Sequence, residues 1–241
     1  MGIEQITGVT VCHNTKAALE LAYMSVRRFH PDLNIVIVDG SDRPDPCAAY
    51  VQSLASELTT AVVPGYNIGH GRGMCLGIKN VKTPYALIFD SDIVMLKSPV
   101  LGMLAMMEED TYGVGYIEKN TAFDGFEWGA KKTHAVEKIG KMWYLHPMFQ
   151  LLSVRRYKEF HPYVHHGAPC YLAMLDIHKK GLSEKILKEF PGLGHSSGKG
   201  WHWAGIPREH VRHNTRGTRD VRVKKHLSEI EGPWEYNRGQ V

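Results

Sequence analysis

The feature that most constrains the fold is a set of four short apolar segments in the first 92 residues, separated by segments with a helical pattern. Each apolar segment is rich in β-branched residues and lacks polar alternation, which is typical of a strand buried on both faces. Strands that alternate with helices predict an α/β fold with a parallel sheet. The expected strands are Ile6–Cys12, Asn34–Val38, Thr59–Val63 and Tyr85–Phe89, and the expected helices lie near 16–29, 47–58 and 72–80.

The second half of the chain is less regular. We expect helices near 100–107 and 169–180, strands near 112–117 and 146–154, and a loop over 121–133. With 241 residues, 43% of them hydrophobic and 22% charged, the chain fits one large globular domain. Thr15 stands where it could cap the first helix.

Composition narrows the classes of function. The net charge of +4 is too small to argue for a nucleic-acid partner. The longest apolar stretches fall far short of the ~20 residues that span a membrane, and the first residues lack the pattern of a signal peptide. The four cysteines are scattered, with no C-x-x-C pair, so they fit reduced thiols better than a disulfide framework or a zinc site. We therefore expect a cytoplasmic protein.

An acidic turn, Asp90-Ser91-Asp92, directly follows the fourth apolar segment. Two carboxylates one residue apart at a strand end can face one hard cation, and Mg²⁺ or Mn²⁺ would then bridge them to a diphosphate. The alternative is a surface turn with solvated acids. Because ligands of parallel sheets bind beyond the carboxyl ends of the strands, the position favours a site, and Asn14 and Asp39 also follow strands.

Five segments together resemble the GT-A glycosyltransferases, especially the family 2 type. They are VTVCHNT, IVIVDGS, YNIGHGRGMCLGIKN, ALIFDSD, and a looser pair formed by HHGAPCYLAMLDIHKKGL and FPGLGHSSGKGW. The resemblance implies a Rossmann-like, mostly parallel sheet flanked by helices, with an irregular acceptor-binding half. It also implies transfer of a hexose from a nucleoside diphosphate sugar to a hydroxyl, with a divalent metal.

The resemblance assigns the donor pocket to residues at the strand ends. Cys12, His13 and Asn14 would line the nucleotide pocket. Asp39 would accept a hydrogen bond from the base or the ribose, and the alternative is a carboxylate that caps a helix or a turn.

The glycine-rich segment before the third helix is the next part of the implied donor site. Gly69, Gly71 and Gly73, with Asn67, would let the backbone approach the donor sugar or diphosphate at a helix N-terminus. Arg72 would contact a phosphate or the sugar. A plain turn and a solvated arginine are the alternatives.

The implied metal site contains Asp90 and Asp92, with Ser91 between them as part of the donor site. Relatives of this kind often add a third metal ligand from the C-terminal region, frequently a histidine. His195 stands in the matching segment, and His202 is the second choice. The glycines and tryptophans around them suggest a lid that closes on the donor.

The general base is the least defined part of the site. Inverting relatives commonly carry an Asp or Glu just before the helix expected at 169–180, and this chain has His165 and His166 there instead. Either histidine would take the proton of the acceptor hydroxyl, or Asp176 would reach in, or no protein base is used. The last case fits a retaining enzyme, in which the leaving phosphate takes the proton, and the missing carboxylate slightly favours it. The alternative for the two histidines is that they cap the helix or pack against Tyr163.

The resemblance divides the domain into a donor half (1–98), an acceptor half (99–205) and a basic tail (206–241). The acceptor would be a glycan, or a lipid-linked or protein-linked group. Arg212, Arg216, Arg219 and Arg222 recur every three to four residues and predict a basic helical face. That face could contact an anionic membrane surface at the inner side of a membrane, or remain solvated.

Three alternatives come from other classes. A haloacid dehalogenase-type phosphatase would use Asp90 as nucleophile and Asp92 as general acid–base, but its acidic motif should open the domain, and three strands come first here. A sugar-nucleotide pyrophosphorylase should carry a glycine-rich loop after the first strand, where this chain has His13-Asn14-Thr15. A binding module without catalysis would explain the missing carboxylate base.

Overall fold

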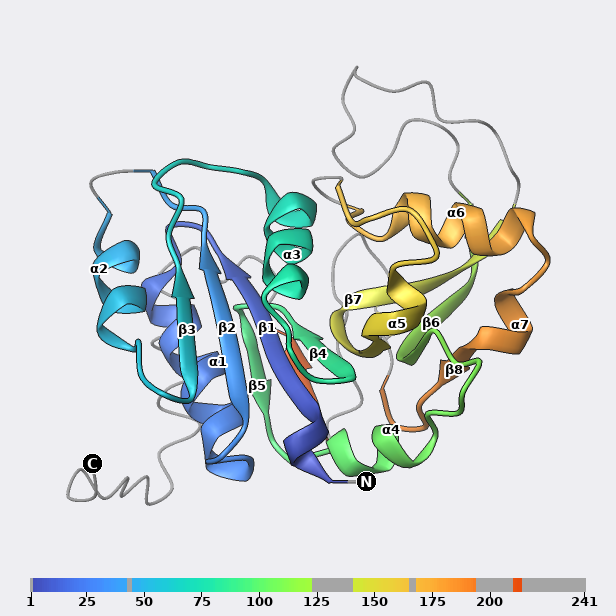
Figure 1. Ribbon diagram of the computed structural model, residues 1–241, viewed down its shortest axis with the longest axis horizontal. Coiled ribbons are helices and arrows are strands. Elements are labelled where there is room, and N and C mark those ends of the chain that lie inside the picture. Colours follow the sequence, from blue (N-terminus) through green and yellow to red (C-terminus); the bar gives the residue numbers. More distant parts are fainter. Residues whose placement is uncertain (1, 43–44, 123–140, 165–167, 194–209, 214–241) are drawn as a thin grey trace, which may run out of the picture.

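The computed structural model describes residues 2–42, 45–122, 141–164, 168–193 and 210–213. These residues form an α/β fold around a seven-stranded sheet of order β3-β2-β1-β4-β7-β6-β8 (Figure 1). The sheet strands are β1 (Ile6–Cys12), β2 (Asn34–Asp39), β3 (Thr59–Val62), β4 (Tyr85–Phe89), β6 (Gly113–Ala122), β7 (Lys141–Ser153) and β8 (Leu187–Glu189). The helices are α1 (Lys16–Phe29), α2 (Pro46–Ser53), α3 (His70–Lys79), α4 (Val100–Ala105), α5 (Val154–Tyr157), α6 (Tyr171–Lys179) and α7 (Ser183–Ile186).

The sheet is parallel apart from one strand. Strands β1 to β4 pair in parallel, while β7 pairs antiparallel with both β4 and β6, and β8 is parallel to β6. The expected parallel α/β sheet is therefore confirmed, and β7 joins it to the second half of the chain. The two halves share one continuous sheet, as a single domain requires.

Side chains alternate between two hydrophobic clusters, one on each face of the sheet. Val9 and Val11 of β1 pack with Met74 and Ile78 of α3 in a cluster that continues to α6. The opposite cluster holds helices α1, α2 and α4 against the other face, with Leu19 among its fully buried residues. Burial on both faces explains why β1, β2 and β4 read as continuous apolar segments.

Helix α3 lies unusually close to β1 because two of its glycines face that strand. A Cβ atom on Gly73 would lie 2.6 Å from Val11 Cγ1, and one on Gly77 would lie closer still to Val9 Cγ1. Neither distance is tolerated by real side chains. Gly73 therefore has a packing role, because it lets the helix rest on the sheet, and the donor contact expected for it stays a prediction.

A Gly77→Ala variant tests this packing. Alanine favours helices over glycine by ~1 kcal/mol, but the added methyl group overpacks the helix–strand contact, which typically costs ~1–3 kcal/mol. We expect net destabilisation in a urea unfolding curve. Adding Val9→Ala should remove the clash with Val9 Cγ1, so the double variant should lose less stability than the two single changes predict together. Simple additivity would contradict the close contact.

Several boundaries differ from the sequence expectations. Helix α2 ends at Ser53 rather than near Leu58, and its N-cap is Asp45, whose side chain accepts from the backbone N–H of Cys47. Helix α3 begins at His70, two residues earlier than expected. Thr15 stands at the N-cap of α1, but its hydroxyl makes no capping bond, so that expectation was wrong.

Three short strands, β5, β8 and β9, were not expected from the sequence. β5 (Ile93–Met95) follows the acidic turn directly and pairs antiparallel with β9 (Val211–His213). The expectation of a basic helical face is therefore wrong at Arg212, which lies in a strand. The other three arginines of that pattern lie outside the described residues. No helix among the described residues is both long enough and apolar enough to cross a bilayer.

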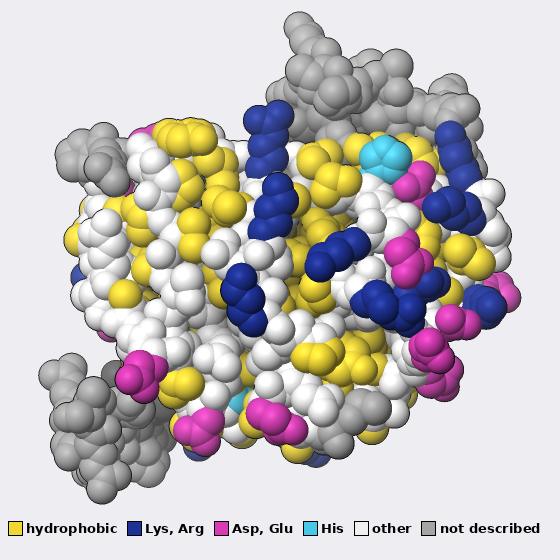
Figure 2. Space-filling model, in the orientation of Figure 1, with side chains coloured by type: hydrophobic (Ala, Val, Ile, Leu, Met, Phe, Trp, Pro, Cys, Tyr) yellow, Lys and Arg dark blue, Asp and Glu magenta, His cyan; other side chains and the backbone are white. Residues whose placement is uncertain are grey.

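Charged side chains on the surface of the second half are largely engaged with one another. Figure 2 shows Lys and Arg side chains beside Asp and Glu in this region. Lys188 pairs with Glu108 at 2.7 Å and Lys185 with Asp110 at 3.6 Å. Such exposed pairs contribute little stability, typically ~0–1 kcal/mol each.

Candidate active site

The carboxyl ends of β1, β2 and β4 meet at one edge of the sheet. Cys12 of β1 is the register partner of Asp39 of β2, and β4 is the other parallel neighbour of β1. The acidic turn follows β4 on the same edge. The sequence expectation that Asn14, Asp39 and Asp90 come together at one end is therefore confirmed by the sheet topology.

The acidic turn is held between β7 and the start of α3. The backbone N–H of Asp90 donates to the carbonyl of Met148 at 2.9 Å, which fixes the turn to β7. Asp90 Oδ1 lies 3.3 Å from His70 Nε2, and the Asp90 side chain keeps 14% of its surface exposed. Ser91 and Asp92 are also half-buried. His70 was missed by the sequence reasoning, because only the fold brings the first residue of α3 to the end of β4.

Asp90 and Asp92 fit a hard divalent cation. Both side chains offer carboxylate oxygens, the ligands that Mg²⁺ and Mn²⁺ prefer, and both are reachable from solvent at a sheet edge. The N-terminal end of α3 points its partial positive charge toward the same region, which suits an anionic ligand. His195 and His202 lie outside the described residues.

The turn after β1 is tied to the turn after β2. Asn14 adopts a left-handed φ of 52°, a conformation that asparagine tolerates better than most residues. Its backbone N–H donates to Ser41 Oγ at 2.8 Å. His13 Nδ1 lies 2.8 Å from the Gly40 carbonyl. Because a carbonyl can only accept, Nδ1 carries a proton, and in the neutral form of the ring Nε2 is then an acceptor.

Asp39 lies beneath the surface of the site. It is fully buried, and its Oδ1 accepts hydrogen bonds from the backbone N–H and the hydroxyl of Ser41. Cys12 Sγ lies 3.5 Å from the same oxygen. Oδ2 has no hydrogen-bond partner among the described residues. The carboxylate therefore fixes the turn after β2, and its expected contact with a donor base requires Oδ2 to become accessible.

The glycine-rich segment forms the start of α3. Gly69 is the N-cap residue with φ +78°, a backbone conformation that favours glycine. Asn67 Oδ1 accepts from the Gly69 N–H at 2.9 Å, which closes the turn before the helix. Arg72 is exposed in the first turn of the helix. The segment thus presents a cation beside the edge that carries the acidic turn.

A second set of polar residues lies between β7 and the start of α6. Gln150 Nε2 donates to Cys170 Sγ at 3.6 Å, and its Oε1 lies 3.4 Å from the Tyr163 hydroxyl. Burial, with a smaller contribution from the negative charge of Asp90, raises the pKa of Cys170 to about 12. Gln150 is the register partner of Ile88, so its contact with Cys170 places the start of α6 beside the end of β4. The sequence reasoning missed Gln150 and Cys170.

Asp176 is already engaged with another residue. Its Oδ2 accepts from the backbone N–H of His161 and lies 2.6 Å from His161 Nδ1. Although partial burial opposes the charge, the bonds from His161 keep the pKa of Asp176 below its usual value. A carboxylate with a lowered pKa is a weak base. His165 and His166 lie outside the described residues, shortly before the start of α6.

Comparison with known proteins agrees with this architecture. A mannosyltransferase from Pyrobaculum calidifontis in complex with GDP-Man and Mn²⁺ is structurally similar over 78% of this chain. The two share 13% sequence identity, and the TM-score is 0.55. TarS 1-349 of S. aureus is similar over 77% of this chain, with 14% sequence identity and a TM-score of 0.54. The UDP-GlcNAc complex of that protein is also similar over 77% of this chain, with 15% identity and a TM-score of 0.53.

The chain spans 55–58% of the length of these solved structures, and the likeness establishes the GT-A fold. A search of curated proteins found no match. The family described as "Glycosyl transferase family 2" matches residues 8–175, which include the ends of β1, β2 and β4, the acidic turn and the first part of α6. The chain belongs to glycosyl transferase family 2.

Proposed function

We propose that this family 2 glycosyltransferase moves a hexose from a nucleoside diphosphate sugar to a hydroxyl of a glycan, a lipid-linked or a protein-linked acceptor. The observation that carries the proposal is the acidic turn, which lies at the ligand-binding edge of the sheet and faces the first residue of α3. The haloacid dehalogenase alternative loses its basis, since the family match includes this turn and β1 to β3 precede it.

Asp90 and Asp92 would hold the metal. Mn²⁺ or Mg²⁺ bound there supplies positive charge that stabilises the leaving diphosphate. The solved relatives support this assignment in general terms, because one was obtained with GDP-Man and Mn²⁺ and another with UDP-GlcNAc. His195 remains our proposed third ligand.

The donor would lie along the edge from β2 to α3. His13 and Asn14 offer an acceptor nitrogen and an amide beside the turn after β2. Asp39 Oδ2 is a buried acceptor without a partner among the described residues, and such an atom gains free energy when an N–H reaches it. Backbone N–H groups after Gly69, with Arg72, would meet the diphosphate.

We assign the general base to His165 or His166, and thereby favour inversion at the anomeric carbon. Two observations support this assignment. Asp176 is paired with His161, and the contact of Gln150 with Cys170 places the start of α6 beside the end of β4. A histidine with an ordinary pKa of ~6.5 is suited to accept a hydroxyl proton near neutral pH.

The cellular setting stays a prediction. We propose a cytoplasmic protein whose basic residues beyond 213 contact the inner face of a membrane when the acceptor is lipid-linked. A vesicle-binding assay with and without anionic lipid separates this from a solvated tail.

Nucleotide-sugar binding is the most direct test of the proposed function. A donor at 100 times its dissociation constant should stabilise the folded chain by ~2.7 kcal/mol. We expect a rise in the melting temperature with one nucleotide sugar of a panel, and a larger rise when Mn²⁺ is present. Asp92→Ala should keep the melting temperature of the free chain and lose the additional effect of Mn²⁺. A panel without any stabilising donor would contradict the proposal.

A further inference from the structure

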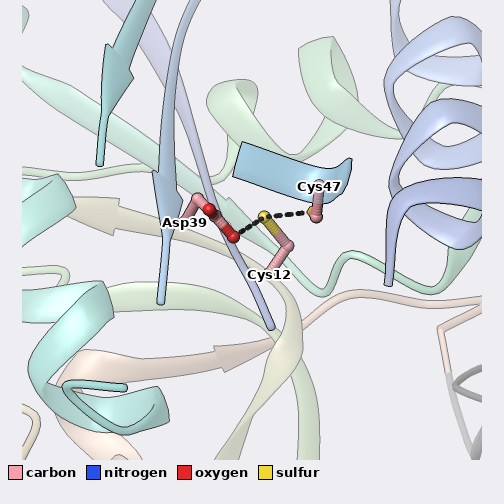
Figure 3. Close-up of side chains that lie close together, drawn as sticks. All are labelled: Cys12, Asp39 and Cys47. Carbon is pink, nitrogen blue, oxygen red and sulfur yellow. Dashed lines mark hydrogen bonds between the residues drawn. The ribbon is translucent and has the colours of Figure 1, made fainter. Parts of the chain in front are cut away.

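Two cysteines that are distant in the sequence meet at the buried end of the sheet. Cys12 ends β1, and Cys47 lies in the first turn of α2. Their sulfur atoms are 3.6 Å apart, and Cys12 Sγ is 3.5 Å from Asp39 Oδ1 (Figure 3). All three side chains are buried, and their possible ligand atoms lie within 4.8 Å of one another.

We propose that Cys12, Cys47 and Asp39 form a zinc site that is separate from the acidic turn. Zinc binds sulfur at ~2.3 Å and carboxylate oxygen at ~2.0–2.2 Å in tetrahedral geometry, so two sulfur ligands should lie ~3.8 Å apart and a sulfur–oxygen pair ~3.6 Å apart. The distances in this structure, 3.6 Å and 3.5 Å, are close to these values. These two pairs therefore already have the spacing of zinc ligands, and the third pair, Cys47 and Asp39, lies within 4.8 Å.

The charge balance of the cluster favours a cation. Asp39 is fully buried, and the described residues place no Lys, Arg or His within ion-pair distance of its carboxylate. A buried charge without a counter-ion is costly. On binding, Zn²⁺ replaces the two thiol protons, which are released to solvent as both sulfurs become thiolates. The net charge of the cluster is unchanged, but a divalent cation then adjoins the carboxylate.

The neighbours of the cluster also suit a metal site. The backbone N–H and the hydroxyl of Ser41 donate to Asp39 Oδ1, which fixes the orientation of that oxygen. Outer hydrogen bonds of this kind orient metal ligands and tune their affinity.

The type of ligand selects the metal. Two thiolates favour zinc over Mn²⁺ or Mg²⁺, which prefer oxygen. The cysteine spacing argued against a zinc site because it contains no C-x-x-C, but that rule applies to ligands from one loop. Here the ligands come from β1, β2 and α2, so only the fold brings them together.

Titration with zinc chloride alone tests the proposal without any donor, so its result does not depend on the proposed function. We expect the metal-free full chain to compete with a chromophoric chelator for one equivalent of zinc. Cys12→Ser and Cys47→Ser should each weaken zinc binding at least ~100-fold. Loss of a hydrogen-bond partner of a metal ligand lowers metal affinity ~10–100-fold, and loss of a residue that binds the metal directly should cost at least as much. Cys75→Ser is the matched control, since Cys75 lies on α3 outside the cluster.

Two measurements on the wild-type chain identify the ligands: the absorption spectrum after cobalt(II) substitution, and X-ray absorption of the zinc-bound chain. Neither measurement needs a serine variant, so the proposal can be tested even if those variants fail to fold. We expect an intense cobalt–thiolate absorption, and sulfur neighbours at ~2.3 Å from bound zinc. Zinc uptake that is equal in the wild type and in folded Cys12→Ser and Cys47→Ser would overturn the proposal. So would a bound zinc without sulfur neighbours, or a reduced wild-type chain that takes up no zinc.

Discussion

Asp92→Ala is expected to lower metal-dependent sugar transfer by about 10³-fold, which corresponds to roughly 4 kcal/mol of lost charge stabilisation. The reason is that, in the proposed function, the acidic turn supplies the carboxylates for the metal beside the leaving diphosphate. Asp90→Ala should have a similar effect and should also remove the contact with His70, which lies 3.3 Å from Asp90. Steady-state rates at saturating Mn²⁺ measure both losses.

The matched control is Asp110→Ala. Asp110 is an exposed carboxylate that pairs with Lys185 outside the acidic turn, so its removal should leave transfer unchanged. Because both Asp90 and Asp92 keep exposed surface, all three variants should unfold near the wild-type temperature. Wild-type transfer by Asp92→Ala and Asp90→Ala would disprove the proposed function.

The second large effect is expected from the two histidines before α6. A positioned general base contributes ~10²–10⁴-fold to the rate, so His165→Ala/His166→Ala should lower kcat by that factor. The single variants then identify which histidine takes the proton. Proton NMR of the product should show an inverted anomeric centre.

His178→Ala is the control for this pair. His178 lies in the last turn of α6, at the other end of the helix from Cys170, so its loss should leave kcat unchanged. An inverted product from a fully active double variant would remove both histidines from the role. A retained configuration would equally contradict the assignment, since the leaving phosphate can then take the proton.

The parts of the fold that the sequence predicts are those determined by local pattern. The predicted bounds of β1, β2 and β4 agree with the structure to within a residue, because burial on both faces leaves an uninterrupted apolar segment. Their parallel arrangement then places the residues after each strand at one edge. This is why the sequence alone is enough to place Asp39 and the acidic turn at the same edge of the sheet.

Other features depend on contacts between distant segments, and no local pattern encodes them. His70 reaches Asp90 only because α3 folds back over the sheet. Cys12 and Cys47 belong to different elements, and their spacing gives no signal. Gly73 shows another case, because its missing side chain permits helix packing against Val11, a contact that the sequence does not indicate.

The pairing of β5 with β9 determines when the donor half can finish folding during synthesis. Met95 and Val211 are both buried and are register partners, although more than a hundred residues separate them. A nascent chain can form the local β1–β4 contacts early, but β5 stays an open edge until residue 213 has left the ribosome. Unpaired edges are a recognised hazard for aggregation, and contacts between distant residues form slowly. Chains that end before residue 211 should therefore expose β5 and aggregate more readily than the 241-residue chain.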